Sequence, residues 1–174
     1  AIIDLIPSFR SCLIHFDTEL TNFELLSSLL MEREAEALSS GHTPEPVLHQ
    51  IPVRYGGPEA LDMKIVCAQT GLPESEVITI HSNEVYTVFA VGFIPGFPYL
   101  GTLDKRIRVP RLETPRTRIT AGSVGIAQGQ TGVYPFPSPA GWRIIGHTDV
   151  HFFNHEKEPY SLLQIGDKVK FVSA

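Results

Sequence analysis

Residues 121–135 read AGSVGIAQGQTGVYP, a short apolar stretch between two glycine pairs of the form G-x-x-G. Ser123–Ala127 has the length and the β-branched residues of a strand, and the glycines on either side permit tight turns. Two interpretations of these turns stay open. They can simply be the ends of a hairpin, or their backbone amides, together with the side chains of Gln130, Thr131 and Tyr134, can bind a polar or anionic ligand.

Around this run, the C-terminal half of the chain consists of short strand patterns separated by turns. Ten of the 14 glycines lie from Gly92 to the end of the chain. The strand patterns are Tyr86–Val91, Ser123–Ala127, Gly132–Tyr134, Trp142–Ile145, Val150–Phe153 and Lys168–Val172. Short strands at this spacing, with few helices between them, predict a mainly β fold, either a barrel or a sandwich.

The first half of the chain alternates strand and helix patterns. In chain order these are Ser11–Phe16 (strand), a helix from Phe23, Gln50–Tyr55 (strand), and helices from Pro58 and Glu74. We therefore expect two domains, a small α/β domain in residues 1–83 and a β-rich domain in residues 84–174. The chain starts at Ala1 without an initiator Met or a signal-peptide pattern, so we expect the first domain to be N-terminally incomplete.

The composition is that of a soluble globular protein, with 43% hydrophobic and 19% charged residues. No apolar run reaches the roughly 18 residues of a transmembrane helix, so we expect no membrane span. Cys12 and Cys67 lie among apolar residues and do not make a disulfide framework. Free thiols of this kind favour a reducing compartment, and we expect a cytoplasmic protein.

Charge is unevenly distributed along the chain. Residues 1–90 carry 13 acidic and 4 basic side chains, whereas residues 91–174 carry 6 acidic and 10 basic ones. Six of the later bases fall between Lys105 and Arg118. A basic cluster on an acidic chain argues against general nucleic-acid binding, and it favours either local anion recognition or a solvated loop surface.

The segment Gly92–Gly101, GFIPGFPYLG, combines three glycines and two prolines with Phe93, Phe97 and Tyr99. The glycines and prolines fix the backbone path, and the aromatic rings supply flat apolar walls. Such a loop can line a ligand pocket or plug one end of a barrel, and both possibilities stay open.

Several polar positions are candidates for a site. Arg116 follows a proline and leads directly into a strand, so we expect it to point inward, where its guanidinium suits a carboxylate or a phosphate. His81 lies at a helix end and is either a structural histidine or a ligand contact. His147, His151 and His155 fall in or beside a strand, where four residues span roughly 13 Å, so we expect no metal site.

Taken together and in order, these segments resemble the allophanate hydrolase subunit 1 family, which includes the B subunit of 5-oxoprolinase and a KipI-type inhibitor of a sporulation histidine kinase. The motifs are GFIPGFPYLG at 92–101, PR and PRTR within 110–118, AGSVGIA and GQTGVYP within 121–135, SPAGW at 138–142 and IGHT at 145–148. They cover about residues 77–174, and residues 1–76 match more loosely. His147 stands where the family usually has arginine.

The resemblance implies a cyclophilin-like β-barrel for the C-terminal domain. It also implies two partners, a homologue of the family's subunit 2 (the C subunit) and a third protein (the A subunit). The assembled complex would carry out ATP-dependent hydrolysis of 5-oxoproline to glutamate. The alternatives are a KipI-type inhibitor of a histidine kinase and a component related to allophanate hydrolase or urea carboxylase.

For the enzymatic function, the chain has neither a G-x-S-x-G nucleophile elbow nor a P-loop. We therefore expect the chain to be inactive alone and the catalytic groups to be shared across a subunit interface. The catalytic candidates are Arg116 and Gln130. The candidate ligand contacts are His81, Phe97, Tyr99, Gly129, Thr131 and Tyr134.

Overall fold

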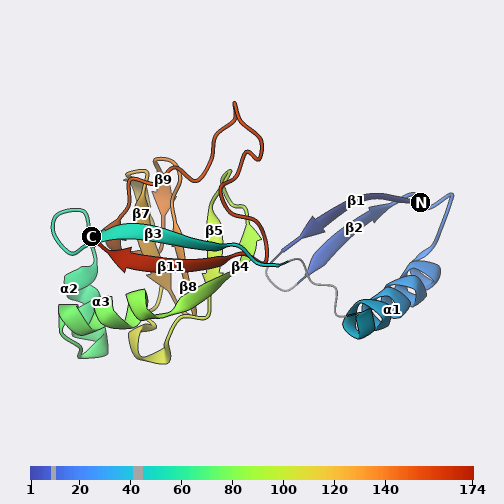
Figure 1. The fold of residues 1–174 in the computed structure, drawn as a ribbon. Coiled ribbons are helices and arrows are strands. Elements are labelled where there is room, and N and C mark those ends of the chain that lie inside the picture. The colour runs from blue at the N-terminus through green and yellow to red at the C-terminus, as the bar shows by residue number, and fades with distance from the viewer. Residues whose placement is uncertain (9–10, 41–44) are drawn as a thin grey trace. The chain divides into compact units, whose positions relative to one another are not determined.

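The computed structural model describes residues 1–8, 11–40 and 45–174, and it divides into two compact units, Ala1–Glu45 and Pro46–Ala174 (Figure 1). The first unit contains an antiparallel hairpin of β1 (Ile2–Pro7) and β2 (Cys12–Phe16), followed by α1 (Phe23–Ser40). The side-chain oxygen of Asn22 accepts from the amide of Leu25 at 2.9 Å and so caps the first turn of α1.

Seven strands of the second unit form a closed barrel in the order β10–β3–β11–β4–β5–β8–β7. Their bounds are β3 (Leu48–Tyr55), β4 (Val85–Val91), β5 (Pro98–Gly101), β7 (Ser123–Ala127), β8 (Gln130–Val133), β10 (Arg143–His147) and β11 (Lys168–Ser173). A separate antiparallel pair joins β6 (Arg116–Ile119) to β9 (Ser138–Ala140). The prediction of a mainly β chain with a C-terminal barrel is confirmed, and of the two predicted architectures it is the barrel.

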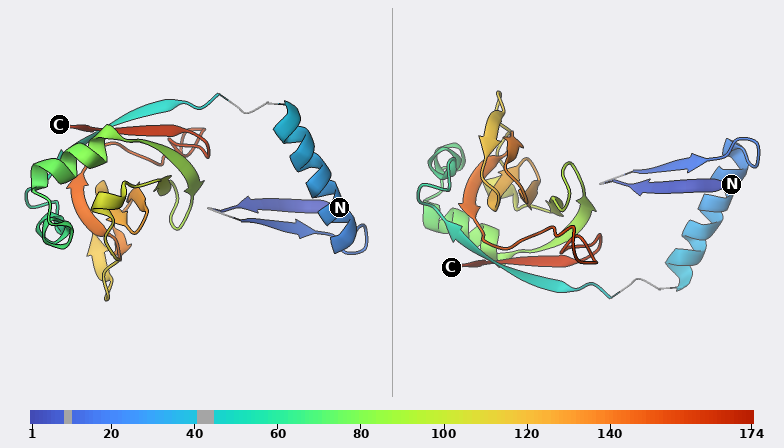
Figure 2. Two further views of the ribbon diagram at one scale, coloured as in Figure 1. Left: turned by 90° about the horizontal axis from the view of Figure 1, so that it is seen from below. Right: turned by 90° about the horizontal axis from the view of Figure 1, so that it is seen from above.

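Two helices and one short 3-10 helix complete the second unit. They are α2 (Met63–Thr70), α3 (Glu74–Asn83) and η1 (Lys105–Ile107). Figure 2 shows α2 and α3 outside the ring of strands, where α2 packs against β10 and α3 against β11. Across the described residues, the helices all fall short of the length and apolarity that a bilayer crossing requires.

The boundary between the two compact units lies earlier in the chain than the predicted boundary at residues 83 and 84. β3 pairs in parallel with β11, from Leu48 opposite Lys168 to Val53 opposite Ser173, so it is a barrel strand. Parallel neighbours are joined by long connections, and a strand pattern by itself does not identify such a distant partner. The segment from β3 through α3 therefore belongs with the barrel.

The predicted strand Val150–Phe153 is wrong. This segment belongs to the long loop between β10 and β11, and its ladder contact is a single bridge between Phe153 and Ser161. The amide of Leu162 donates to the carbonyl of Phe152 at 2.9 Å, so the loop pairs with itself. The strand-like pattern arose because the ring of Phe152 is buried in the core.

His81 of α3 lies fully buried in the barrel core. The hydroxyl of Thr131 donates to the carbonyl of Gly125 at 3.0 Å and therefore accepts from His81 Nε2, 2.8 Å away. This leaves His81 Nδ1 to accept from the hydroxyl of Tyr55 at 2.6 Å, and the imidazole stacks on Phe171 with ring centroids 4.7 Å apart. Burial lowers the pKa of His81 to about 3, so the ring is neutral near pH 7.

The carboxylate of Asp62, directly before α2, is fully buried and joins three elements. Its two oxygens accept from both terminal nitrogens of Arg116 in β6, at 2.8 and 2.9 Å. It also accepts from the amide of Ile144 in β10 at 2.8 Å, and Arg143 Nη1 lies 3.6 Å away. Arg116 therefore points toward the interior, as expected, and its two terminal nitrogens are engaged by a buried carboxylate.

We expect the free energy of unfolding to fall as the pH drops from about 6.5 toward about 3. In this window the unfolded chain binds a proton at His81 and the folded chain does not. The contribution is therefore complete above the unfolded-state pKa and declines below it, by up to ~1.4 kcal/mol per pH unit. Urea unfolding across this range measures the slope. A His81→Gln variant, which does not titrate, should show a shallower slope, and equal slopes would contradict the account.

We expect Arg116→Met to lower the free energy of unfolding by about 3 kcal/mol or more, because it leaves the buried carboxylate of Asp62 without its main counter-charge. Arg118→Met is the matched control on the same strand, since Arg118 is exposed, and it should change stability by less than ~0.5 kcal/mol. Urea unfolding measures both variants. Equal losses in the two would show that the Asp62–Arg116 pair does not hold the fold.

Candidate functional site

The second unit contains a small cavity walled mainly by aromatic side chains, which we call the aromatic cavity. Its volume is about 100 Å³, and its lining residues are Phe93, Phe97, Tyr99, Arg111, Tyr134, Pro139, Gly141 and Trp142. The buried ring of Phe97 lies at the centre of this group. It packs edge to face against Tyr99, Tyr134 and Trp142, with ring centroids 4.9, 4.9 and 5.4 Å apart.

Two glycines of the run at 121–135 make room for these rings on the outer face of the barrel. Gly125 of β7 lies opposite Gly132 of β8. A Cβ atom on Gly132 would lie 2.6 Å from the carbonyl oxygen of Pro98, and one on Gly125 would lie 3.2 Å from Cβ of Trp142. At these two positions β7 and β8 must therefore carry no side chain, so that the aromatic rings can lie against their outer face.

The same arrangement explains why β7 is buried along its whole length. Val124 and Ile126 belong to the core inside the barrel, whereas Ala127 packs with the aromatic rings outside it. Side chains alternate between the two faces of a strand, and both faces of β7 are covered. The apolar, small-residue composition of this strand follows from that double coverage.

Two hydrogen bonds, one at each residue that flanks Arg111, hold it beside the aromatic cavity. The amide of Leu112 donates to the carbonyl of Gly141 at 2.8 Å. Arg143 Nε donates to the carbonyl of Pro110 at 3.3 Å. The segment that carries Arg111 is thereby tied to the start of β10 and to the residues before it, where the cavity wall lies.

The charged and hydroxyl groups that line the aromatic cavity are one guanidinium and two phenols. The guanidinium carbon of Arg111 lies 5.8 Å from the ring centroid of Trp142, within the range of a cation–π contact. Burial raises the pKa of Tyr134 to about 12, and burial also raises the pKa of Tyr99, an effect that Arg111 partly offsets. Both phenols are protonated at neutral pH, so the cavity offers a positive charge and hydroxyl donors.

The other candidates on β8 lie on different faces of the strand. Gln130 shares the outer face with Gly132, whereas Thr131 points into the core beside His81. Among the described residues, Nε2 of Gln130 is buried and has no hydrogen-bond partner. Gly129 lies in the turn before β8, where its carbonyl accepts from a backbone amide at 2.9 Å.

The structure thus brings part of the predicted site together. Phe97, Tyr99 and Tyr134 line one cavity. Arg116 is engaged by Asp62, and His81 lies in the barrel core. Neither of them lines the aromatic cavity, so their predicted roles in ligand binding and catalysis stay predictions.

Two residues of the cavity wall, Arg111 and Trp142, are not among the sequence-based candidates. Two sequence features could have pointed to them: a proline precedes Arg111, and Trp142 is the single tryptophan of the chain. Arg116 also follows a proline. What distinguishes the two arginines is that the carboxylate of Asp62 accepts hydrogen bonds from Arg116. No local sequence pattern reveals where Asp62 lies in space.

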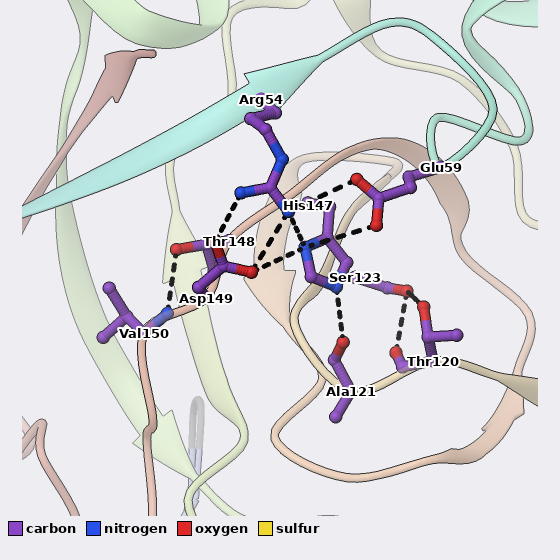
Figure 3. Close-up of polar contacts among 9 residues, drawn as sticks. All are labelled: Arg54, Glu59, Thr120, Ala121, Ser123, His147, Thr148, Asp149 and Val150. Carbon is purple, nitrogen blue, oxygen red and sulfur yellow. Dashed lines mark hydrogen bonds and ion pairs between the residues drawn. The ribbon is translucent and has the colours of Figure 1, made fainter.

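A cluster of charged and polar side chains surrounds His147 at the end of β10 (Figure 3). Arg54 of β3 forms ion pairs with Asp149 and with Glu59. His147 Nδ1 lies 3.0 Å from Arg54 Nη2, and its Nε2 lies 2.7 Å from the carbonyl oxygen of Ala121. Hydrogen bonding to Arg54 lowers the pKa of Asp149. The cluster sets two carboxylates against the guanidinium of Arg54, which makes it a weaker candidate for an anionic ligand.

A larger groove of about 610 Å³ lies next to this cluster. It is lined by Pro58, Glu59, Leu61, Arg118, Ile119, Thr120, Ala121 and Pro137. Most of these side chains are apolar, and Arg118 is the single cation among them. Among the described residues, no group of three or more His, Cys, Asp or Glu side chains is placed to hold a metal ion.

Comparison with known proteins identifies the family. The model for the carboxyltransferase domain, subdomain C and D, matches residues 1–163. The B subunit of 5-oxoprolinase from Escherichia coli O157:H7 is 46% identical over 139 residues, which are 80% of this chain and 62% of that protein. The B subunit of 5-oxoprolinase from Bacillus subtilis (strain 168) is 41% identical over 180 residues, covering 98% of this chain and 75% of that protein.

Solved structures extend these similarities. The conserved uncharacterized protein PH0987 of Pyrococcus horikoshii is 43% identical with a TM-score of 0.71, over 99% of this chain and 79% of that one. The urea amidolyase of Kluyveromyces lactis is 20% identical with a TM-score of 0.77, over 99% of this chain and 12% of that one, and it shows the fold alone. This chain spans only about three fifths of the length of the Escherichia coli protein.

Proposed function

Because this chain belongs to the carboxyltransferase subdomain C and D family, as a relative of the 5-oxoprolinase B subunit, we propose that it is the corresponding subunit of a 5-oxoprolinase-type complex. The observation that carries the proposal is the 41–46% identity to three proteins of that name, over 71–98% of this chain. The subunit name implies partners. The family resemblance adds a homologue of the C subunit and a third protein, the A subunit.

The reaction of such a complex is the opening of a five-membered cyclic amide. ATP transfers its terminal phosphoryl group to the amide oxygen, which makes the ring carbon open to attack by water. Breaking the ring C–N bond, with the nitrogen taking up a proton, then gives γ-glutamyl phosphate and leaves ADP as the other product. A second water molecule hydrolyses this acyl phosphate to glutamate and inorganic phosphate. Negative charge develops on oxygen as water attacks, and it needs nearby donors such as guanidinium or hydroxyl groups.

The aromatic cavity supplies some of these groups and lacks others. Arg111, Tyr99 and Tyr134 can donate hydrogen bonds. Its lining contains no carboxylate, histidine or cysteine that could serve as a general base or a nucleophile. Within the described residues, the aromatic cavity therefore has no base or nucleophile in its lining, which supports the proposal that a partner protein supplies the base and the ATP site.

We expect glutamate to be released from 5-oxoproline and ATP when the full-length protein is combined with its A-type and C-type partners. The protein alone should release none, because its cavity lacks a base. The measurement is a coupled assay for glutamate together with one for inorganic phosphate. The two products should appear in equal amounts.

Two controls test whether turnover requires the C-type partner and the hydrolysis of ATP. Omission of the C-type partner should abolish turnover, and replacement of ATP by a non-hydrolysable analogue should do the same. A stable complex of all three proteins that releases no glutamate would refute the proposed function. Glutamate release by the protein alone would refute the shared site.

A further inference from the structure

We infer that the aromatic cavity binds the cyclic amide itself, with the ligand carboxylate at Arg111 and the amide carbonyl at a tyrosine hydroxyl. The inference rests on the proposed function, because it assigns the substrate of that function to one site of this chain. Five features of the cavity support it: its size, its aromatic walls, the charge of Arg111, its two tyrosine hydroxyls and the backbone conformation of Phe93.

The size of the cavity restricts the ligand to a small molecule. Its volume of about 100 Å³ accommodates one small ring, whereas pockets for larger organic ligands usually measure ~300–1,000 Å³. The walls are rings packed edge to face around Phe97. Aromatic faces attract the polarised C–H groups of a saturated ring. A five-membered lactam fits these walls, and a nucleotide does not.

Arg111 is the guanidinium that remains available to a ligand at this cavity. The neighbouring arginines are engaged: Arg106 by Asp104, Arg108 by the carbonyl of Leu103, Arg116 by Asp62 and Arg143 by the carbonyl of Pro110. No hydrogen bond or ion pair between described residues involves Arg111, whose guanidinium lies over Trp142. Its parallel N–H groups match a carboxylate in a two-point contact.

The two tyrosine hydroxyls complete the match with the ligand. Tyr99 and Tyr134 line the same cavity as Arg111, and both hydroxyls carry their protons at neutral pH. A lactam carbonyl is a strong acceptor for such a donor. A ring with a carboxylate on one carbon and a carbonyl on another therefore finds an apolar wall, a cation and a hydroxyl donor in one small space.

Phe93 at this cavity gives independent support. Its φ is 72°, in the left-handed region that bulky residues rarely adopt. The residue is 63% exposed, yet its ring packs edge to face against Phe97 with ring centroids 5.7 Å apart. Strained backbone of this kind clusters at ligand sites, where the surrounding structure holds it in place. A ligand ring in the cavity would cover this exposed aromatic side chain.

The chain provides its own reporter for the test, because Trp142 is its single tryptophan and lines the cavity. L-5-Oxoproline added to the full chain should change the Trp142 emission in a saturable manner. 2-Pyrrolidone, which lacks the carboxylate, and L-proline, which lacks the lactam carbonyl, should each bind at least roughly tenfold more weakly. Equal affinity for all three compounds, or no saturable change with 5-oxoproline, would overturn the inference.

Variants locate the carboxylate contact. Arg111→Met should raise the dissociation constant for 5-oxoproline roughly 10- to 100-fold and leave that for 2-pyrrolidone unchanged. Arg111→Lys should recover part of the loss because it restores the charge without the planar fork. Arg118→Met, outside the cavity, should bind like the unaltered chain. An Arg111→Met variant that binds 5-oxoproline normally would overturn the inference.

Kinetic measurements on the assembled complex distinguish a failure of this inference from a failure of the proposed function. Turnover with an unchanged KM for 5-oxoproline in Arg111→Met would overturn the inference and leave the function standing. Saturable, Arg111-dependent binding in a complex that releases no glutamate would support the inference and overturn the function. A raised KM for 5-oxoproline with little change in KM for ATP supports both.

Discussion

The buried carboxylate of Asp62 is the interaction on which the arrangement of the second unit depends. It holds Arg116 of β6 through two hydrogen bonds and the amide of Ile144 in β10 through a third. A fully buried carboxylate is tolerated only when charges and donors surround it. The β6–β9 sheet, the start of α2 and β10 are therefore fixed to one another at this point.

This fixed point determines the geometry of the aromatic cavity. Arg143 and Ile144 begin β10, directly after Trp142. Arg143 also holds the carbonyl of Pro110, and with it the segment that carries Arg111. The guanidinium of Arg111 and the indole of Trp142 thus approach each other because β10 is anchored at Asp62. In this account Arg116 acts on the site by positioning its wall.

Much of the fold could be predicted from local sequence. Ser123–Ala127 is a strand with the bounds that its pattern indicated, and the glycines around it mark close approaches of backbone and ring. The parallel pairing of β3 with β11 could not be predicted in this way, because it joins segments far apart in the chain. For the site, Phe97 and Tyr99 could be selected from the aromatic loop, but the role of an arginine depended on where a distant carboxylate lies.

A structure of the full chain with L-5-oxoproline tests the central claim most directly. The account predicts the ligand ring against Phe97 and Trp142 in the aromatic cavity, with its carboxylate within hydrogen-bonding distance of Arg111. A ligand in the groove beside Arg118, or one at the Arg54–His147 cluster with the aromatic cavity unchanged, would contradict it.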